Sequence, residues 1–335
     1  MTRPSESVFA IRTEGLTKDF SIGFWRRRPH RVLDQLTLAV EPGEIFGFLG
    51  PNGAGKTTTI KLLMQLIFPT SGRAEILGQP VGSVGVRRRV GYLPETPYFY
   101  DNLTAEELLT YFAKLFGYDS TDRRRRVERI LDAVGIGVER RHLLRRFSKG
   151  MLQRVGIAQA LLNDPEVVFL DEPMSGLDPI GRREIRELIL GLRQQGRTVF
   201  LSSHILADAE SMCSQVAILV GGRLAKVGPL GDILSFDRGW ELVVADLPAA
   251  ARSALGARAQ QVTEIGPGRY VFELGASDPD PFVRACVSGG GRVVSLNPLH
   301  ESLEDLFVRL VEVEVERERA QADGDAGRAA EASES

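Results

Sequence analysis

Cysteine is scarce in this chain of 335 residues, since only Cys213 and Cys286 occur and their spacing is unlike that of a metal site. A disulfide framework is therefore not expected, and this usage fits a reducing compartment. Long hydrophobic runs are also missing: no stretch reaches about 18 apolar residues, so we expect no membrane-spanning helix. Residues 1–7 are polar and lack the apolar core of a secretion signal.

An excess of charge of one sign is absent as well, because the formal net charge is −2. Bulk attraction for nucleic acid is therefore not indicated, and no nucleic-acid partner is expected. Hydrophobic residues make up 43% of the chain and charged residues 26%. This composition is that of a globular protein, and the length allows one large domain and a smaller one.

The segment from Gly50 to Thr57 has the spacing of a phosphate-binding P-loop: Gly, four residues, Gly, Lys, Thr. An apolar run of strand length, residues 45–49, precedes it, and residues 58–66 have helical spacing. Glycines let backbone N–H groups close around phosphates, and a helix N-terminus favours the same anion. Lys56 is expected to reach the β- and γ-phosphates, and the Thr57 hydroxyl to ligate Mg²⁺. An ordinary glycine-rich turn is the alternative, but the strand–loop–helix context disfavours it.

Three more continuous apolar runs, residues 167–170, 198–202 and 216–220, alternate with helical segments. That pattern predicts strands buried on both faces of a parallel sheet. Residues 8–22 and 32–40 instead read as an edge strand and a half-buried strand.

The helical pattern between about residues 100 and 165 predicts a helical insert. Thr104 and Glu107 have the spacing of a capping box at its start, and helical spacing continues to Asn163. Residues 123–126 are four arginines, which we interpret as a solvated face, with a partner contact as the alternative.

A basic and aromatic loop, residues 22–31, contains Phe24 and Trp25. A solvated insertion is the favoured interpretation. The alternative is a surface that contacts anionic headgroups or a membrane partner.

Composition changes near residues 236–239. Beyond them the pattern predicts strand, helix, strand, strand, helix and strand, the order of a ferredoxin-like α+β domain, followed by a final helix. We expect this domain to span 238–314. The tail, 317–335, is rich in Ala, Glu, Asp and Gly and is expected to be disordered.

Acidic and small polar residues recur downstream of the P-loop. Asp171 and Glu172 follow the apolar run 167–170, which delivers both carboxylates to the edge of the sheet where α/β folds bind ligands. Asp171 would hold Mg²⁺, and Glu172 would polarise a water for attack on the γ-phosphate. Ser148 has the character of a helix N-cap, and His204 follows the strand at 198–202.

In their order and spacing these segments resemble the ATP-binding subunit of an ABC transporter, over about residues 8–230. The resemblance implies an α/β fold of the ABC-type P-loop NTPases, with a mixed sheet, an antiparallel β edge subdomain and a helical insert. We expect the ATP-binding domain to span 8–235. Two copies of such a subunit hold two ATP molecules head to tail.

The resemblance also implies roles for individual residues. Glu172 would be the catalytic base, His204 the switch histidine on the γ-phosphate, and Asp178 a contact across the dimer. Phe20 would stack on adenine, with Phe24 and Trp25 as rivals. The positions that would bind ATP and its Mg²⁺ are Gly50, Asn52, Gly53, Gly55, Lys56, Thr57 and Thr58 of the P-loop, Ser148 and Gly150 of the signature segment, and Asp171.

Two positions depart from the family's pattern. The usual signature Leu-Ser-Gly-Gly-Gln is replaced by residues 147–151, so that Lys149 stands at the first glycine and its side chain must avoid or pair with the nucleotide. Glu95 stands where the family has a glutamine that touches Mg²⁺ and water, and a carboxylate there is repelled by phosphate unless a cation screens it. Both departures, and the small C-terminal domain, resemble a subgroup of drug, sodium and lipid or polysaccharide exporters.

We therefore expect an ATP-hydrolysing motor that dimerises on ATP and drives a separate integral membrane permease from the cytoplasmic face of the inner membrane. A soluble ABC-type ATPase acting on ribosomes or nucleic acid is the main alternative, and a small-molecule kinase a remoter one. The C-terminal domain could serve as a sensor, a dimer brace or a permease contact. The transported substrate is not encoded in any of these motifs.

Overall fold

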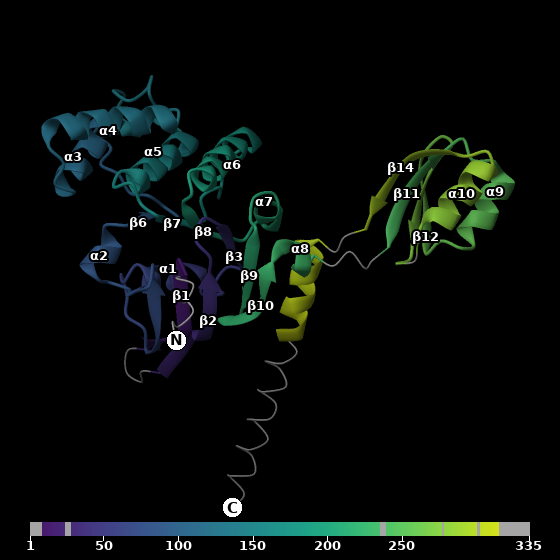
Figure 1. Ribbon diagram of the computed structural model, residues 1–335, viewed down its shortest axis with the longest axis horizontal. Helices are drawn as coiled ribbons and strands as arrows, with labels where there is room; N and C mark the ends of the chain where they lie inside the picture. Colours follow the sequence, from purple (N-terminus) through teal and green to yellow (C-terminus); the bar gives the residue numbers. More distant parts are fainter. Residues whose placement is uncertain (1–8, 24–27, 235–238, 277, 300–301, 315–335) are drawn as a thin grey trace, which may run out of the picture. The chain divides into compact units, whose positions relative to one another are not determined.

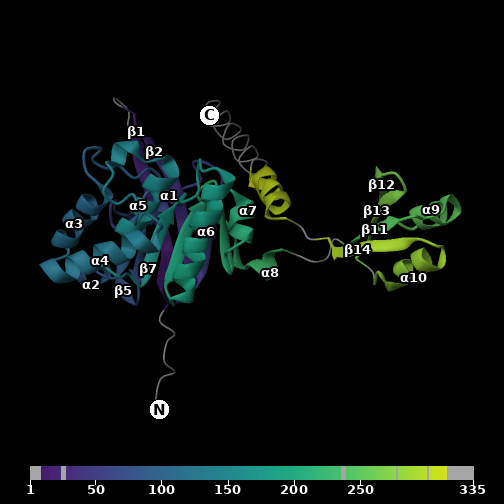
Figure 2. The same ribbon diagram turned by 90° about the horizontal axis from the view of Figure 1, so that it is seen from above.

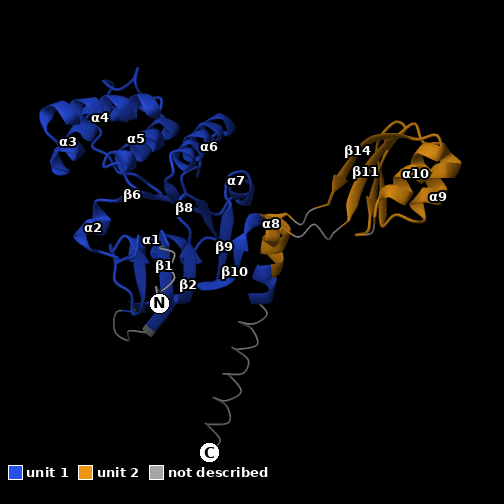
Figure 3. Cartoon of the chain, viewed as in Figure 1, with its two compact units in different colours: residues 1–230, 310–335 blue, residues 231–309 orange. Residues whose placement is uncertain are grey.

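The computed structural model describes residues 9–23, 28–234, 239–276, 278–299 and 302–314. Two compact units divide the chain, one of residues 1–230 and 310–335, the other of residues 231–309 (Figure 3). Phe24, Trp25 and the tail 317–335 lie outside the described residues. Within the described ranges, no helix has the length and apolar character needed to cross a membrane.

A six-stranded sheet forms the centre of the first unit, in the order β10-β9-β3-β8-β7-β6. The parallel members are β9 (Gln215–Val220), β3 (Ile45–Leu49), β8 (Thr198–Ser203), β7 (Val167–Asp171) and β6 (Val90–Leu93); β10 (Arg223–Pro229) is antiparallel. Every residue of β3, β7 and β8 is buried, which confirms the strands predicted from continuous apolar runs. The Phe46 and Phe200 rings stack between neighbouring strands with centroids 5.5 Å apart.

An antiparallel sheet in the order β2-β1-β4-β5 packs in the same unit. Its strands are β1 (Ile11–Ile22), β2 (Arg28–Val40), β4 (Ser71–Ile76) and β5 (Gln79–Pro80). Apolar residues of β1 and β2 share one hydrophobic core with Phe46, Phe48 and helix α1 (Lys56–Leu63). This is the β edge subdomain expected from the sequence, and it shares its hydrophobic core with the central sheet.

Most other helices of the first unit either cover the central sheet or build the helical insert. The insert contains α3 (Ala105–Leu115), α4 (Ser120–Ala133), a 3₁₀ turn (Leu144–Arg146) and α5 (Lys149–Leu161). The other helices of the unit are α2 (Val84–Arg87), α6 (Pro179–Gln194) and α7 (Leu206–Glu210), and α8 (Leu230–Ile233) begins where the first unit ends in the sequence. Figures 1 and 2 both show α3, α4 and α5 gathered at one end of the unit. The capping box is confirmed, since the Glu107 N–H donates to Thr104 Oγ1 and the Thr104 N–H to Glu107 Oε2. The expectation of helix throughout to Asn163 is wrong for residues 116–119 and for residues 134–143. The chain turns in both segments, where Gly117 has a φ of +82° and Gly135 a φ of +71°.

The second unit has the ferredoxin-like topology predicted from the sequence. Its elements in chain order are β11 (Trp240–Ala245), α9 (Ala249–Gly256), β12 (Gln261–Gly266), β13 (Arg269–Leu274), α10 (Asp280–Ser288) and β14 (Arg292–Pro298). The sheet order β12-β13-β11-β14 is antiparallel throughout. Leu242, Phe272 and Phe282 lie in its own hydrophobic core, and residues 303–314 form a helix after it.

Candidate functional site

The P-loop connects β3 directly to α1, and β3 lies between two parallel strands, β8 and β9. A Cβ on Gly50 would overlap the backbone carbonyl of Leu219, so only glycine fits where the loop leaves the sheet. Gly55, with a φ of +104°, is the N-cap of α1 and offers no capping side chain. The first N–H groups of α1 therefore keep their capacity to bind an anion, as the motif predicts.

The side chain of Lys56 folds back over this loop. Its Nζ donates to the carbonyl oxygens of Gly50, at 2.7 Å, and of Pro51, at 3.2 Å. It also lies 3.2 Å from Oε1 of Glu172, and the two side chains are only 6% and 7% exposed. The ammonium is thus held at the mouth of the loop, close to where phosphates would lie.

Asp171 at the end of β7 accepts two hydroxyl hydrogen bonds on one oxygen. Ser202 Oγ donates to Asp171 Oδ1 at 2.6 Å, and Thr57 Oγ1 donates to the same atom at 3.1 Å. Ser202 Oγ also accepts the backbone N–H of Glu172 at 3.0 Å. Asp171 and Ser202 are register partners of β7 and β8, so the pairing of two parallel strands assembles this contact.

The other oxygen of Asp171, Oδ2, is buried and has no hydrogen-bond partner within the described ranges. Burial raises the pKa of Asp171, while the hydrogen bonds from Ser202 and Thr57 lower it and the nearby Glu95 and Glu172 raise it further. An orphaned carboxylate oxygen beside a threonine hydroxyl is the donor set that Mg²⁺ prefers, so these residues fit that ion.

The Glu172 carboxylate contacts two other elements, through Lys56 of α1 and through His204 after β8. Its Oε2 lies 2.7 Å from His204 Nδ1 and accepts the His204 backbone N–H at 3.3 Å. Its own backbone has a φ of +49°, in the left-handed region that residues with a Cβ seldom occupy. Such strain is retained when surrounding contacts over-determine it, and here Lys56, Ser202 and His204 all hold the residue.

A hollow of about 470 Å³ opens over the P-loop and contains most of the predicted nucleotide contacts. Glu95 lines this hollow together with Thr57 and Glu172, which agrees with the position expected from the family's glutamine. His30 and Val32 of β2 line its far side, whereas Phe20 does not line it. Phe20 is the register partner of His30 and is 38% exposed, with Lys18 Nζ 5.0 Å from its ring centroid. The other lining residues are Asn52, Gly53, Gly55, Lys56 and Thr58.

Three further predicted residues, Ser148, Gly150 and Asp178, lie around a second hollow of about 530 Å³ that shares no lining residue with the first. Ser148 is the N-cap of α5, since its Oγ accepts the Met151 N–H at 3.2 Å. Asp178 is the N-cap of α6, since its Oδ1 accepts the Gly181 N–H at 2.7 Å. Ser148, Gly150 and Asp178 all border this hollow, so two helix N-termini meet there.

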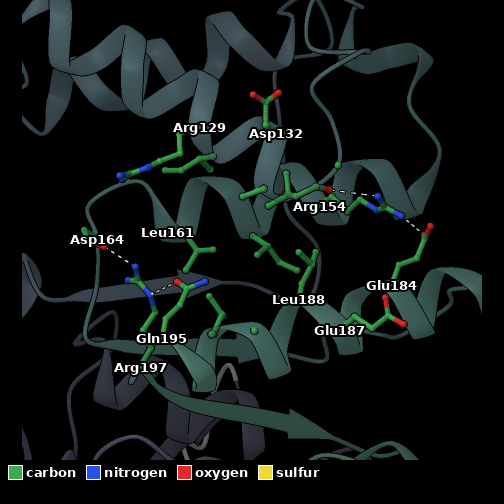
Figure 4. Close-up of a pocket in the computed structure, with 17 residues that line it drawn as sticks. Arg129, Asp132, Arg154, Leu161, Asp164, Glu184, Glu187, Leu188, Gln195 and Arg197 are labelled. Carbon is green, nitrogen blue, oxygen red and sulfur yellow. Dashed lines mark hydrogen bonds and ion pairs between the residues drawn. The ribbon is translucent and has the colours of Figure 1, made fainter.

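Behind the second hollow lies a cleft of about 770 Å³ between α4, α5 and α6 (Figure 4). Arg154 on α5 borders both spaces, pairs with Glu184 on α6, and donates to the carbonyl oxygen of Val134 at 3.4 Å. Leu161 and Leu188 belong to the apolar part of the cleft. The Arg154–Glu184 pair fixes the helices that carry Ser148 and Asp178 relative to each other.

Two contacts of this site carry no sequence signal of their own. Ser202 and Arg154 stand next to motifs, but their partners come from other elements, 31 and 30 positions along the chain. Only the strand register and the helix packing bring them together.

Comparisons with known proteins match these features. The profile of the ABC transporter family matches residues 33–175. An uncharacterized ABC transporter ATP-binding protein of Synechocystis is 46% identical over 92% of this chain and 86% of its own length. The bacitracin transport ATP-binding protein of Bacillus licheniformis is 37% identical over 90% of this chain and 97% of its own. A dimeric ATP-binding cassette, solved in a post-hydrolysis state with ADP and Pi, superposes with a TM-score of 0.60 and 25% identity over 66% of this chain and 98% of its own.

Proposed function

Because the chain belongs to the ATP-binding proteins of ABC transporters, whose members hydrolyse ATP to drive transport, we propose that two copies of it close head to tail on two ATP molecules. The observation that carries this proposal is the separation of the predicted contacts into two hollows with no residue in common. One chain therefore offers two separate surfaces. The first is the hollow over the P-loop, here called the P-loop hollow, and the other is the second hollow, here called the signature hollow because Ser148 and Gly150 border it. A second copy, turned end for end, brings its signature hollow to the nucleotide of the first.

The P-loop hollow supports a role for each of its charged residues. Lys56 leaves Glu172 and binds the β- and γ-phosphates, which frees the Glu172 carboxylate to accept a proton from the attacking water. His204 holds that carboxylate through Nδ1 and reaches toward the γ-phosphate. Mg²⁺, when bound, neutralises developing charge on the phosphates. Thr57, Asp171 and Glu95 are the residues that would hold it.

The cassette drives a separate integral membrane permease, and it lies peripherally at the cytoplasmic face of the membrane. The chain's similarity to a bacitracin transport protein supports a transporter partner, and the departures at Lys149 and Glu95 support an exporter. No basic excess supports the alternative partner, a ribosome or nucleic acid, because the net charge is −2.

Affinity purification of the Glu172→Gln chain from its native membranes with ATP and Mg²⁺ tests this proposal. A stoichiometric multi-span membrane protein is the expected companion. The matched control is Glu172→Gln combined with Lys56→Ala, which cannot hold the phosphates and should lose the ATP-dependent part of the capture. A catch of ribosomal or DNA-bound proteins with no membrane protein would overturn the transporter partner.

Transport direction needs a second measurement. Inverted membrane vesicles that contain the captured permease and this chain should accumulate substrate when ATP is added outside. Accumulation only in right-side-out vesicles with ATP trapped inside would contradict export.

A further inference from the structure

Asp208 is a charged side chain buried on the short helix α7. It is the third residue of that helix and follows His204 by four positions. Its side chain is only 7% exposed, and the other buried residues of α7, Leu206 and Ala209, are apolar. A carboxylate in such surroundings costs free energy unless a cation or hydrogen-bond donors compensate its charge.

Arg186 of α6 is the one ion-pair partner that the structure records for Asp208 among the described residues. Its Nη2 lies 3.9 Å from Asp208 Oδ1, and Figures 1 and 2 both show α7 beside α6. This distance is longer than a hydrogen bond, so the contact is one of charge. Arg186 Nε and Asp208 Oδ2 are both buried and have no hydrogen-bond partner in the described part of the chain. Unfilled bonding atoms reduce stability, which points to a functional reason for keeping the pair.

Helix α7 needs a directional contact because its other contacts do not fix its orientation. A helix of five residues does not form by itself, and no side chain caps the N-terminus of this one. It packs on β3 and β8, and its buried apolar residues hold it there without a preferred direction. The charge contact between Asp208 and Arg186 therefore sets the rotation of α7 against the rest of the unit.

His204 lies in the short connection between β8, which ends at Ser203, and α7, which begins at Leu206. Both contacts of His204 with Glu172 Oε2, from Nδ1 at 2.7 Å and from the backbone N–H at 3.3 Å, depend on the path of this connection. A rotation of α7 would displace His204 from Glu172.

We propose that Arg186 is a positioning residue for ATP hydrolysis. It holds Asp208 and, through α7, keeps the His204 ring aligned with Glu172 and with the γ-phosphate. This inference rests on the role proposed above for His204. In the alternative, the pair only stabilises the packing of α7 against α6, and its loss then affects turnover whether or not His204 is present.

The first test measures steady-state ATP turnover by the full chain. Arg186→Met should lower kcat about tenfold with little change in KM, and Arg186→Lys should restore most of the loss. Arg183→Met is the matched control on the same helix, because Arg183 pairs with Glu187 at exposed positions, and it should change neither constant. Unchanged kcat in Arg186→Met would overturn the proposal.

Asp208→Asn provides a second variant that nearly keeps the side-chain shape and replaces Arg186→Met if that protein does not fold. It should lower kcat to the same extent. The double variant Arg186→Met with Asp208→Asn should be no worse than either single one, because both changes remove one contact. Additive losses would show that the two residues act separately and would overturn the proposal.

The His204→Ala background separates positioning from packing. There Arg186→Met should change kcat by less than about twofold, because the residue that it positions is already missing. An equal loss in both backgrounds would leave Arg186 with a structural role only. If His204→Ala by itself leaves kcat unchanged, the role proposed for His204 fails and this inference fails with it.

Imidazole NMR signals of histidine-labelled protein give a readout that needs no residual turnover. The spectrum of His204→Ala assigns the His204 signals. Arg186→Met should shift them and leave those of His142, an exposed residue of the helical insert, in place. Unshifted His204 signals in Arg186→Met would overturn the alignment through α7, whatever the kinetics show.

Discussion

Lys56 of the P-loop and Glu172 at the end of β7 form a buried ion pair, with Nζ 3.2 Å from Oε1. The lysine that should bind phosphate is thus held by the carboxylate that should activate water. In the mechanism proposed above, nucleotide binding exchanges one anionic partner of Lys56 for another and releases Glu172 when the γ-phosphate arrives. That proposal links nucleotide binding to activation of the base through one side chain.

Replacing Glu172 with glutamine should separate these two effects. The turnover number for ATP should fall by about 10²–10⁴-fold, since a general base contributes that much. ATP should nevertheless bind about tenfold more tightly, equivalent to about 1.4 kcal/mol, because Lys56 no longer leaves a charged partner. Phosphate release and calorimetric titration of ATP measure the two quantities. Weaker ATP binding would contradict the competition for Lys56.

Ser202→Ala should impair turnover more than binding. The change removes the hydroxyl that donates to Asp171 Oδ1 and accepts the Glu172 N–H, so both acidic residues lose a positioning contact. We expect kcat to fall about tenfold to a hundredfold with little change in KM. Ser203→Ala is the matched control, because among the described residues the Ser203 hydroxyl forms hydrogen bonds only with the backbone of Ile205. Equal losses in the two variants would argue against a specific role for Ser202.

Arg154→Met should destabilise the first unit by about 2–3 kcal/mol. It removes a charge-assisted contact to Glu184 and leaves the carbonyl of Val134 without its donor, while the side chain is only 18% exposed. Glu184→Gln should cost about 1 kcal/mol or less, because Glu184 is 45% exposed. Urea unfolding followed by a probe in the first unit measures both. A larger cost for Glu184→Gln than for Arg154→Met would contradict this ranking.

Both cysteines should resist alkylation in the folded protein. Burial raises the pKa of the Cys213 thiol to about 12 and also raises the pKa of Cys286. A raised thiol pKa lowers the thiolate fraction, to about one in ten thousand for Cys213 at pH 8, and the thiolate is the species that reacts. Unfolding restores an ordinary pKa and access, so iodoacetamide at pH 8 should label each cysteine only as its own unit unfolds. Mass spectrometry identifies the labelled residue, and rapid labelling of native protein would refute the expectation.

How much the sequence predicts differs between the two units. In the second unit every predicted strand and helix is present in the predicted order, because short elements there are separated by clear turn residues. In the first unit the pattern does not predict β10 (Arg223–Pro229), since this antiparallel edge strand is largely exposed and has no apolar run. Helical spacing in the insert predicts one continuous helix because apolar residues recur across both breaks, although Gly117 and Gly135 turn the chain there.

The same distinction applies to the candidate site: residues tied to a local sequence pattern are predictable, and contacts between distant elements are not. The P-loop, Asp171, Glu172 and His204 are predictable because each is tied to a strand end or a glycine pattern, and they do converge on one hollow or its rim. Their chemical roles stay predictions. Pattern reasoning does not find the contacts of Ser202 and Arg154, because the first depends on strand register and the second on helix packing.

The left-handed backbone of Glu172, with its φ of +49°, is a local cost that substitution does not readily remove. Glycine or asparagine would relax the backbone at this position. Either residue would also leave the buried ammonium of Lys56 without its carboxylate partner, which costs more than the strain that is relieved. A screen for heat resistance and a screen for ATP turnover should therefore both retain the strained glutamate.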